Sequence, residues 1–140
     1  MKINIFGSTG EIGSKSLLIL NRYFKDISIN ILVANKNYKK LAKQAKQYKP
    51  KIISLFDDTK ISKLKKELSN FKNIKILNYS ELNDFLNRSQ CDISILSISG
   101  NSALLYLESI FNNSINLGLV NKESIISCGH LLKKINKKKN

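Results

Sequence analysis

The chain has 140 residues, a formal net charge of +14, and apolar residues at 42% of its positions. This length suits one domain with a genuine core, but not a cofactor domain together with a substrate domain. No apolar run is long enough to cross a bilayer, the first residues lack the layout of a signal peptide, and the two cysteines form neither a metal-binding spacing nor a disulfide framework. We therefore expect a reduced, cytoplasmic protein of one domain with no membrane partner.

The positive charge raises the question of nucleic-acid binding. Among the 24 basic residues, however, only Arg22 and Arg88 are arginines. Asparagine and isoleucine are also abundant, and they share A/T-rich codons with lysine, so the base composition of a genome would raise all three together. Selection for phosphate or base contacts should also raise arginine. We therefore interpret the charge as compositional, predict no nucleic-acid partner, and keep a nucleic-acid-associated protein as the minor alternative.

Predicted strands and helices alternate along the chain. Apolar and β-branched runs predict strands, and apolar residues at helical spacing predict the helices that follow them. The strands are expected at 3–6, 27–33, 52–56, 74–77, 93–98 and 115–120, and the helices at 14–24, 38–48, 61–68, 81–86, 103–111 and from about 122 onward. This alternation implies right-handed crossovers. It predicts the α/β class: a Rossmann-type, doubly wound, mostly parallel sheet in a single domain.

The strongest motif is the glycine loop, residues 7–13, with the sequence Gly-Ser-Thr-Gly-Glu-Ile-Gly directly after the first predicted strand. In dinucleotide-binding domains, such a loop uses Gly7 for a tight turn, Gly10 for close approach of the backbone to the pyrophosphate, and Gly13 for packing of the helix on the strand. The N–H groups at the start of the helix then face the anion. Glu11 either points to solvent and interacts with the helix dipole, or weakens phosphate binding.

The end of the second predicted strand indicates which dinucleotide is bound. Domains that bind NAD usually carry an acidic residue there, about twenty residues past the glycine loop, which holds the ribose 2′-hydroxyl. Residues 33–37 are Val-Ala-Asn-Lys-Asn and contain no acid. Lys36, with Asn35 and Asn37, favours a 2′-phosphate and hence NADP(H). The alternative is that Lys36 is one of many solvated surface lysines.

A second constellation, Asn-Lys-Glu-Ser at 121–124, follows the last predicted strand. It is typical of a helix start, with Asn121 as the N-cap, and the ends of parallel strands share one edge of a sheet. Together with the glycine loop, residues 33–37 and the Ser-Cys-Gly at 127–129, it makes the chain resemble the N-terminal NADPH-binding domain of 1-deoxy-D-xylulose 5-phosphate reductoisomerases. The resemblance covers essentially the whole chain.

This resemblance implies an NADPH-dependent enzyme that isomerises 1-deoxy-D-xylulose 5-phosphate and reduces the intermediate to 2-C-methyl-D-erythritol 4-phosphate, in non-mevalonate isoprenoid biosynthesis. Family enzymes also use a divalent metal, Mg or Mn, and the complete enzyme is expected to be a homodimer. Residues 1–140 would form the NADPH-binding domain, with Lys122 reaching the substrate. The residues expected to contact the cofactor are Gly7, Thr9, Gly10, Glu11, Ile12, Gly13, Asn35, Lys36, Asn37, Gly100, Asn121 and Glu123.

The family's acidic metal ligands lie beyond the point that corresponds to residue 140. We therefore assign no catalytic or metal-binding residue to this chain, interpret Asp57, Asp58 and Asp92 as loop and strand-edge residues, and expect cofactor binding without turnover. The chain also departs from the family pattern. It has Asn35 where the family commonly has Gly, Glu11 for Ser, Val120 for Ala, and Asn101-Ser102 for two small residues.

Two further alternatives stay open from the sequence. One is another NADP-dependent N-domain, similar to that of aspartate-semialdehyde dehydrogenases, which share a glycine loop of this kind. The other is a non-catalytic, nucleotide-binding relic. Nothing in the segment at 121–124 points to the dehydrogenase family, whereas the relic stays open.

Overall fold

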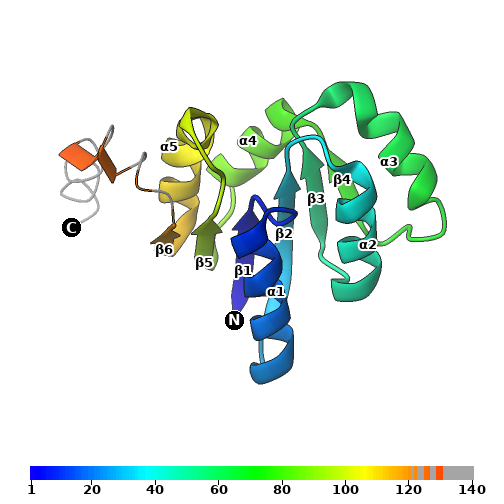
Figure 1. The fold of residues 1–140 in the computed structure, drawn as a ribbon, viewed down its shortest axis with the longest axis horizontal. Helices are drawn as coiled ribbons and strands as arrows, with labels where there is room; N and C mark the ends of the chain where they lie inside the picture. Colours follow the sequence, from blue (N-terminus) through cyan, green and yellow to red (C-terminus); the bar gives the residue numbers. More distant parts are fainter. Residues whose placement is uncertain (121, 123–124, 127–128, 131–140) are drawn as a thin grey trace.

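The six strands form one sheet in the order β4-β3-β2-β1-β5-β6 (Figure 1). The structure is a computed structural model that describes residues 1–120, 122, 125, 126, 129 and 130. Every strand pairing among these residues is parallel, which confirms the predicted doubly wound α/β fold. The strands are β1 (Lys2–Phe6), β2 (Ser28–Ala34), β3 (Ile52–Leu55), β4 (Lys75–Leu77), β5 (Cys91–Leu96) and β6 (Ser114–Leu119).

The helices connect the strands as crossovers. They are α1 (Glu11–Tyr23), α2 (Tyr38–Tyr48), α3 (Ile61–Glu67), α4 (Tyr79–Asn87) and α5 (Leu104–Asn113), with short 3₁₀ turns at Asp58–Lys60 and Asn101–Ala103. Within the described part of the chain, no helix combines the length and apolar character needed to span a bilayer. The helix predicted from about residue 122 falls mostly outside the described residues.

Two helices begin earlier than the apolar spacing predicted. Helix α1 starts at Glu11 rather than Ser14, because the chain turns into the helix directly at Gly10. Helix α4 starts at Tyr79 rather than Glu81, because a capping box fixes its first turn. In that box, the Asn78 side chain accepts a hydrogen bond from the Glu81 N–H, and the Glu81 carboxylate accepts one from the Asn78 N–H, both at 2.9 Å.

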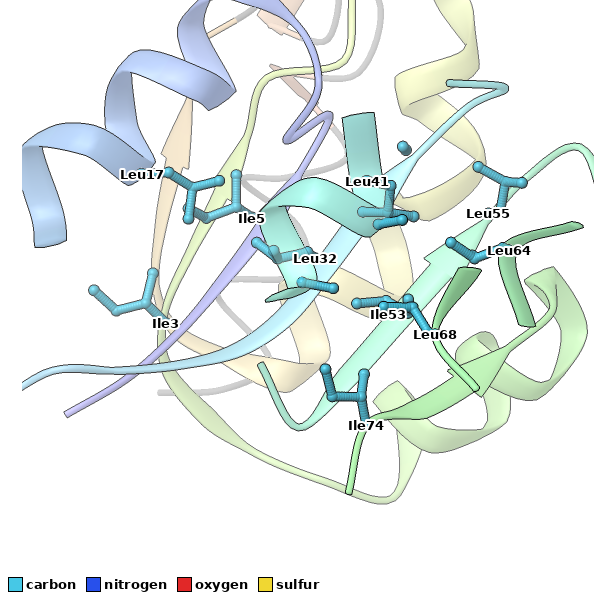
Figure 2. Packing of buried hydrophobic residues seen from close by; sticks show 13 residues of the cluster. Ile3, Ile5, Leu17, Leu32, Leu41, Ile53, Leu55, Leu64, Leu68 and Ile74 are labelled. Atoms are coloured by element: carbon cyan, nitrogen blue, oxygen red, sulfur yellow. The ribbon is translucent and has the colours of Figure 1, made fainter. Parts of the chain in front are cut away.

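The sheet is covered on both faces, so consecutive strand residues are buried on opposite sides. One hydrophobic cluster joins the sheet to α1, α2 and α3 through Leu17, Leu41 and Leu64, and Figure 2 shows Leu17 beside the strand residue Ile5 within this cluster. The second cluster joins the opposite face to α4 and α5. Such double burial explains the continuous apolar runs from which the strands were predicted.

A buried polar ladder crosses this otherwise apolar interior. Asn30 on β2 donates to the Asn4 side chain on β1 at 2.8 Å, and Asn4 donates to the Asn113 side chain on α5 at 2.9 Å. Asn113 in turn donates to the carbonyl oxygens of Leu86 and Ser89 at the end of α4. The ladder therefore ties two central strands to the helices on one face, and its buried amides are satisfied by one another.

Candidate nucleotide-binding site

The glycine loop closes a tight turn between β1 and α1. Gly7 has a φ of +85°, and the N–H groups of Gly7 and Ser8 both donate to the carbonyl oxygen of Val33 on β2 at 2.9 Å. The N–H of Gly10 donates to the Gly7 carbonyl oxygen at 3.0 Å, and α1 begins at the next residue without a side chain capping its N-terminus. The first turn of α1 therefore presents backbone N–H groups to an incoming anion.

The three glycines of the loop differ in what surrounds them. A Cβ on Gly13 would strike the Gly7 carbonyl oxygen and lie 2.7 Å from the Ser8 Cα, and a Cβ on Gly7 would lie 2.7 Å from the Ser97 carbonyl oxygen. A Cβ on Gly10 would approach only the Gly7 carbonyl oxygen, at 3.3 Å. Gly7 and Gly13 are thus required by packing within the fold, whereas the Gly10 side of the loop is open to a ligand.

Two side chains of α2 form hydrogen bonds with the glycine loop. The Ser8 hydroxyl donates to the Gln44 side-chain oxygen at 2.9 Å, and the Gln44 amide donates back to the Ser8 carbonyl oxygen at 2.7 Å. One turn earlier, the Lys40 ammonium donates to the Thr9 carbonyl oxygen at 2.7 Å. Gln44 and Lys40 were not predicted as site residues. Their only sequence signal is a spacing of four, which places them on one face of a helix without showing what that face meets.

The end of β2 leads directly into α2. Asn37 is the N-cap of α2, and its side chain accepts a hydrogen bond from the Lys40 N–H at 3.1 Å. Asn35 and Lys36 are exposed. Among the described residues, Lys49 is the only non-glycine residue with a positive φ, so the backbone at Asn35 has no requirement for the glycine common in the family. The two exposed side chains stand at the edge where the ribose of a dinucleotide is expected.

A cavity of about 290 Å³ lies between the glycine loop and the ends of β2, β3 and β5. Its walls are the loop residues Gly7, Thr9 and Gly10, the segments 33–35 and 97–99, and Phe56, Ser102 and Tyr106. It opens at the carboxyl ends of parallel strands, next to the point between β1 and β5 where the strand order reverses. Crevices at this point are where open α/β sheets bind ligands.

Glu11 forms an ion pair with Lys15 on the same helix. Its carboxylate lies 2.7 Å from the Lys15 ammonium, one turn further along α1, and both side chains are exposed. The hydrogen bond and the charge of Lys15 hold the pKa of Glu11 below its usual value. The pair offsets, but does not remove, the negative charge that Glu11 places in the first turn of α1.

The structure brings most of the predicted cofactor residues to this one edge. Gly7, Thr9, Gly10 and Asn35 line the cavity, Glu11, Ile12 and Gly13 form the first turn of α1, and Lys36 and Asn37 lead into α2. Gly100 lies in the loop after β5, between lining residues Ser99 and Ser102, with a φ of +74°. Lys122 is helical and exposed, whereas Asn121 and Glu123 lie outside the described residues.

Two aromatic residues of the cavity were not predicted as site residues. Phe56 follows β3, and Tyr106 lies on α5 with 2% of its surface exposed. Burial, reinforced by the nearby Tyr79 and Asp58, raises the pKa of Tyr106 well above its usual value, so its hydroxyl stays protonated.

Within the described ranges, no three His, Cys, Asp or Glu side chains are grouped so that they could hold a metal ion.

A six-stranded parallel sheet with a glycine loop between β1 and α1 places the chain in the class of Rossmann-like α/β domains. The family model described as 1-deoxy-D-xylulose 5-phosphate reductoisomerase matches residues 3–129. The chain belongs to this family.

Relatives and solved structures agree with this assignment. The chain is similar to the reductoisomerase of Pelagibacter ubique, with 39% identity over 138 residues that cover 98% of this chain and 36% of that protein. The enzyme of Wigglesworthia glossinidia brevipalpis is 31% identical over 136 residues, covering 95% of this chain and 34% of its own length.

Among solved structures, the Zymomonas mobilis reductoisomerase in complex with NADPH superposes with a TM-score of 0.86 at 25% identity, covering 98% of this chain and 36% of that one. A reductoisomerase in complex with NADPH, fosmidomycin and magnesium shares the fold, with a TM-score of 0.88 at 24% identity, covering 99% of this chain and 34% of that one. The chain thus spans about a third of the length of the relatives it matches.

Proposed function

We propose that this chain binds NADPH and supplies the cofactor-binding part of a 1-deoxy-D-xylulose 5-phosphate reductoisomerase. The observation that carries this proposal is the glycine loop, in which Gly7 and Gly13 are fixed by packing while Gly10 faces a cavity beside the first turn of α1. Such a turn suits the pyrophosphate of a dinucleotide. The solved relative from Zymomonas mobilis, described as a complex with NADPH, supports the choice of ligand.

The preference for NADPH over NADH rests on charge at the end of β2. Residues 33–37 carry no carboxylate, and Lys36 is exposed there. The fold brings two carboxylates nearby: that of Asp57, whose N–H donates to the Asn35 carbonyl oxygen at 2.9 Å, and that of Asp58, which is close to Tyr106. The Asp57 carboxylate lies 3.3 Å from the Lys60 ammonium and accepts a hydrogen bond from the Thr59 N–H. A 2′-phosphate at this edge would therefore meet the exposed ammonium of Lys36, while the negative charge of Asp57 is offset by Lys60.

The activity proposed for the complete enzyme is the isomerisation of 1-deoxy-D-xylulose 5-phosphate and its reduction to 2-C-methyl-D-erythritol 4-phosphate, in non-mevalonate isoprenoid biosynthesis. NADPH supplies the hydride of the reduction. The chain's own part is to fix the pyrophosphate on the glycine loop and the 2′-phosphate at residues 35–37, with Gly100, Asn121 and Glu123 as further cofactor contacts and Lys122 directed to the substrate. We further propose that the complete enzyme is a cytoplasmic homodimer that uses Mg or Mn, and that these 140 residues bind cofactor without turnover.

The test is a calorimetric titration of the folded chain with NADPH and, separately, with NADH. We expect saturable binding with a clear preference for NADPH. Lys36→Glu should weaken NADPH binding at least about tenfold, because it replaces a charge-assisted contact with repulsion, and should affect NADH much less. Lys63→Glu is the matched control: it makes the same charge change on an exposed position of α3, and should leave both affinities unchanged.

Equal weakening of NADPH by the Lys36 and Lys63 variants would show that only the total charge matters, and the assignment of Lys36 would be wrong. Absence of binding to either nucleotide, from wild-type chain shown to unfold cooperatively, would overturn the proposed function itself.

A further inference from the structure

The four carbonyl oxygens of the turn at residues 7–10 all accept hydrogen bonds from within the chain. That of Gly7 accepts from the Gly10 N–H at 3.0 Å and from the Ser97 hydroxyl at 3.3 Å. That of Gly10 accepts from the Ser14 N–H at 3.0 Å, at the start of α1. These two carbonyl oxygens are therefore held by the turn itself, by α1 and by the segment after β5.

The carbonyl oxygens of Ser8 and Thr9 are held by side chains of α2. The Gln44 amide donates to the Ser8 carbonyl oxygen at 2.7 Å, and the Gln44 side-chain oxygen accepts from the Ser8 hydroxyl at 2.9 Å. The Ser14 hydroxyl adds a longer bond to the same carbonyl oxygen, at 3.1 Å. The Lys40 ammonium donates to the Thr9 carbonyl oxygen at 2.7 Å. Gln44 is buried and Lys40 is exposed, and their spacing of four places both on the side of α2 that meets the loop.

The direction of these two carbonyl groups decides what an anion meets at the loop. In a peptide group the oxygen carries partial negative charge and the N–H carries partial positive charge, and in a trans peptide the two point in opposite directions. A Ser8 carbonyl held toward α2 therefore directs the Thr9 N–H away from α2, and Thr9 lines the cavity. A carbonyl of Ser8 or Thr9 that turned toward the cavity would instead repel a bound phosphate.

We propose that Gln44 and Lys40 are positioning residues for the pyrophosphate of the nucleotide, an inference that rests on the proposed function. They keep the Ser8 and Thr9 carbonyl oxygens turned toward α2, so that the anion meets the N–H side of the loop. Neither belongs to the described residues that line the cavity, and so both act through the loop. Their effect differs from that of Lys36, because NADPH and NADH carry the same pyrophosphate and only NADPH carries the 2′-phosphate.

The first test compares Lys40→Met with its matched control Lys43→Met, by calorimetric titration with NADPH and, separately, with NADH. Both lysines are exposed on α2, so each variant removes one charge from the same helix. The titrations are run in about 0.3 M salt, where attraction between distant charges is screened. We expect Lys40→Met to weaken both nucleotides by the same factor, about three- to tenfold, as for a lost hydrogen bond. Lys43→Met should leave both affinities unchanged, and Lys40→Arg, which keeps a donor, should restore binding.

The second test removes the other donor without changing the net charge. Gln44→Met keeps the bulk of the side chain but loses the amide, and Gln47→Met makes the same change at an exposed position of α2. We expect Gln44→Met to weaken NADPH and NADH equally, again about three- to tenfold, and Gln47→Met to leave both unchanged. Affinities are compared well below the melting temperature of each variant, so that the folded chain is measured in every case. If Gln44→Met does not fold, the Lys40 variants decide.

Three results would overturn the positioning role. Wild-type affinity for both nucleotides in Lys40→Met would show that the loop keeps its geometry without this donor. A loss for NADPH alone would show that Lys40 binds the 2′-phosphate directly, and equal losses in Lys40→Met and Lys43→Met would show that only the charge of α2 matters. If the wild-type chain binds neither nucleotide, the proposed function fails instead.

Discussion

Glu11 is the acidic side chain of the first turn of α1, where the proposed pyrophosphate would lie. Because Lys15 offsets its charge only in part, Glu11→Gln should strengthen NADPH binding, by about two- to fivefold at low salt, and the gain should shrink as salt screens the charge. Glu67→Gln is the control, since Glu67 is also exposed and pairs with Lys46 at 3.7 Å but belongs to α3. Equal gains from the two variants would contradict a local role for Glu11.

The pH dependence of stability gives an independent measure of the Glu11–Lys15 pair. The pKa of Glu11 is lowered from 4.5 in the folded chain, chiefly by the hydrogen bond from Lys15. The folded state therefore gains stability from the ionised carboxylate above about pH 4.5, and loses it as the pH falls through the lowered pKa. Thermal unfolding of Glu11→Gln should show a slightly lower melting temperature than wild type at neutral pH. This difference should vanish in acid, and a difference that stays constant with pH would exclude the pair as its cause.

Among the secondary-structure elements, the glycine loop contains one glycine that the fold needs, Gly13, and one that the ligand needs, Gly10. Gly13→Ala would force the new methyl group against the Gly7 carbonyl oxygen and the Ser8 Cα, so we expect a loss of about 1–3 kcal/mol or more in the free energy of unfolding. Gly10→Ala meets only the Gly7 carbonyl oxygen, at 3.3 Å, so the fold should change little while NADPH binding is lost. Denaturant unfolding and NADPH titration of the two variants check this. A Gly10 variant that binds normally would show that the backbone there does not approach the ligand.

The asparagine ladder predicts a cost for a polar residue buried within a central strand. Asn4 both accepts from Asn30 and donates to Asn113, so Asn4→Ala leaves two buried amide groups without these partners. We expect a loss of about 2–4 kcal/mol in the free energy of unfolding, measured with urea. Asn70→Ala, at an exposed position, should change it by less than about 0.5 kcal/mol. A near-neutral Asn4→Ala would show that the ladder contributes little to stability.

At the scale of the whole molecule, the features predictable from the sequence are those set by neighbouring residues. The run Ile31-Leu32-Val33 is buried on both faces of the sheet and could be recognised as a central strand. The spacing of the three glycines likewise predicted a turn followed by a helix. Both depend on local backbone chemistry, which a single sequence carries.

Contacts between distant residues could not be predicted in this way. Gln44 looks like an ordinary polar helix residue until α2 packs behind Ser8, 36 residues earlier in the chain. Asn4 interrupts an apolar run, and its partner Asn113 is 109 residues away. Tyr106 lines the cavity because α5 brings its ring against that of Phe56, which follows β3. These pairings depend on the order of the strands, which periodicity does not determine.

We propose that NADPH lies along the carboxyl edge of the sheet, across the glycine loop and the end of β2. Its most direct test is the two-dimensional amide NMR spectrum of the isotopically labelled chain, recorded with and without saturating NADPH. We expect the largest shifts in residues 7–13, 35–37 and 97–100, and we expect NADH to reproduce the shifts in 7–13 but not those in 35–37. Shifts confined to the lysine-bearing surfaces of α2 and α3, or equal for the two nucleotides at every residue, would contradict it.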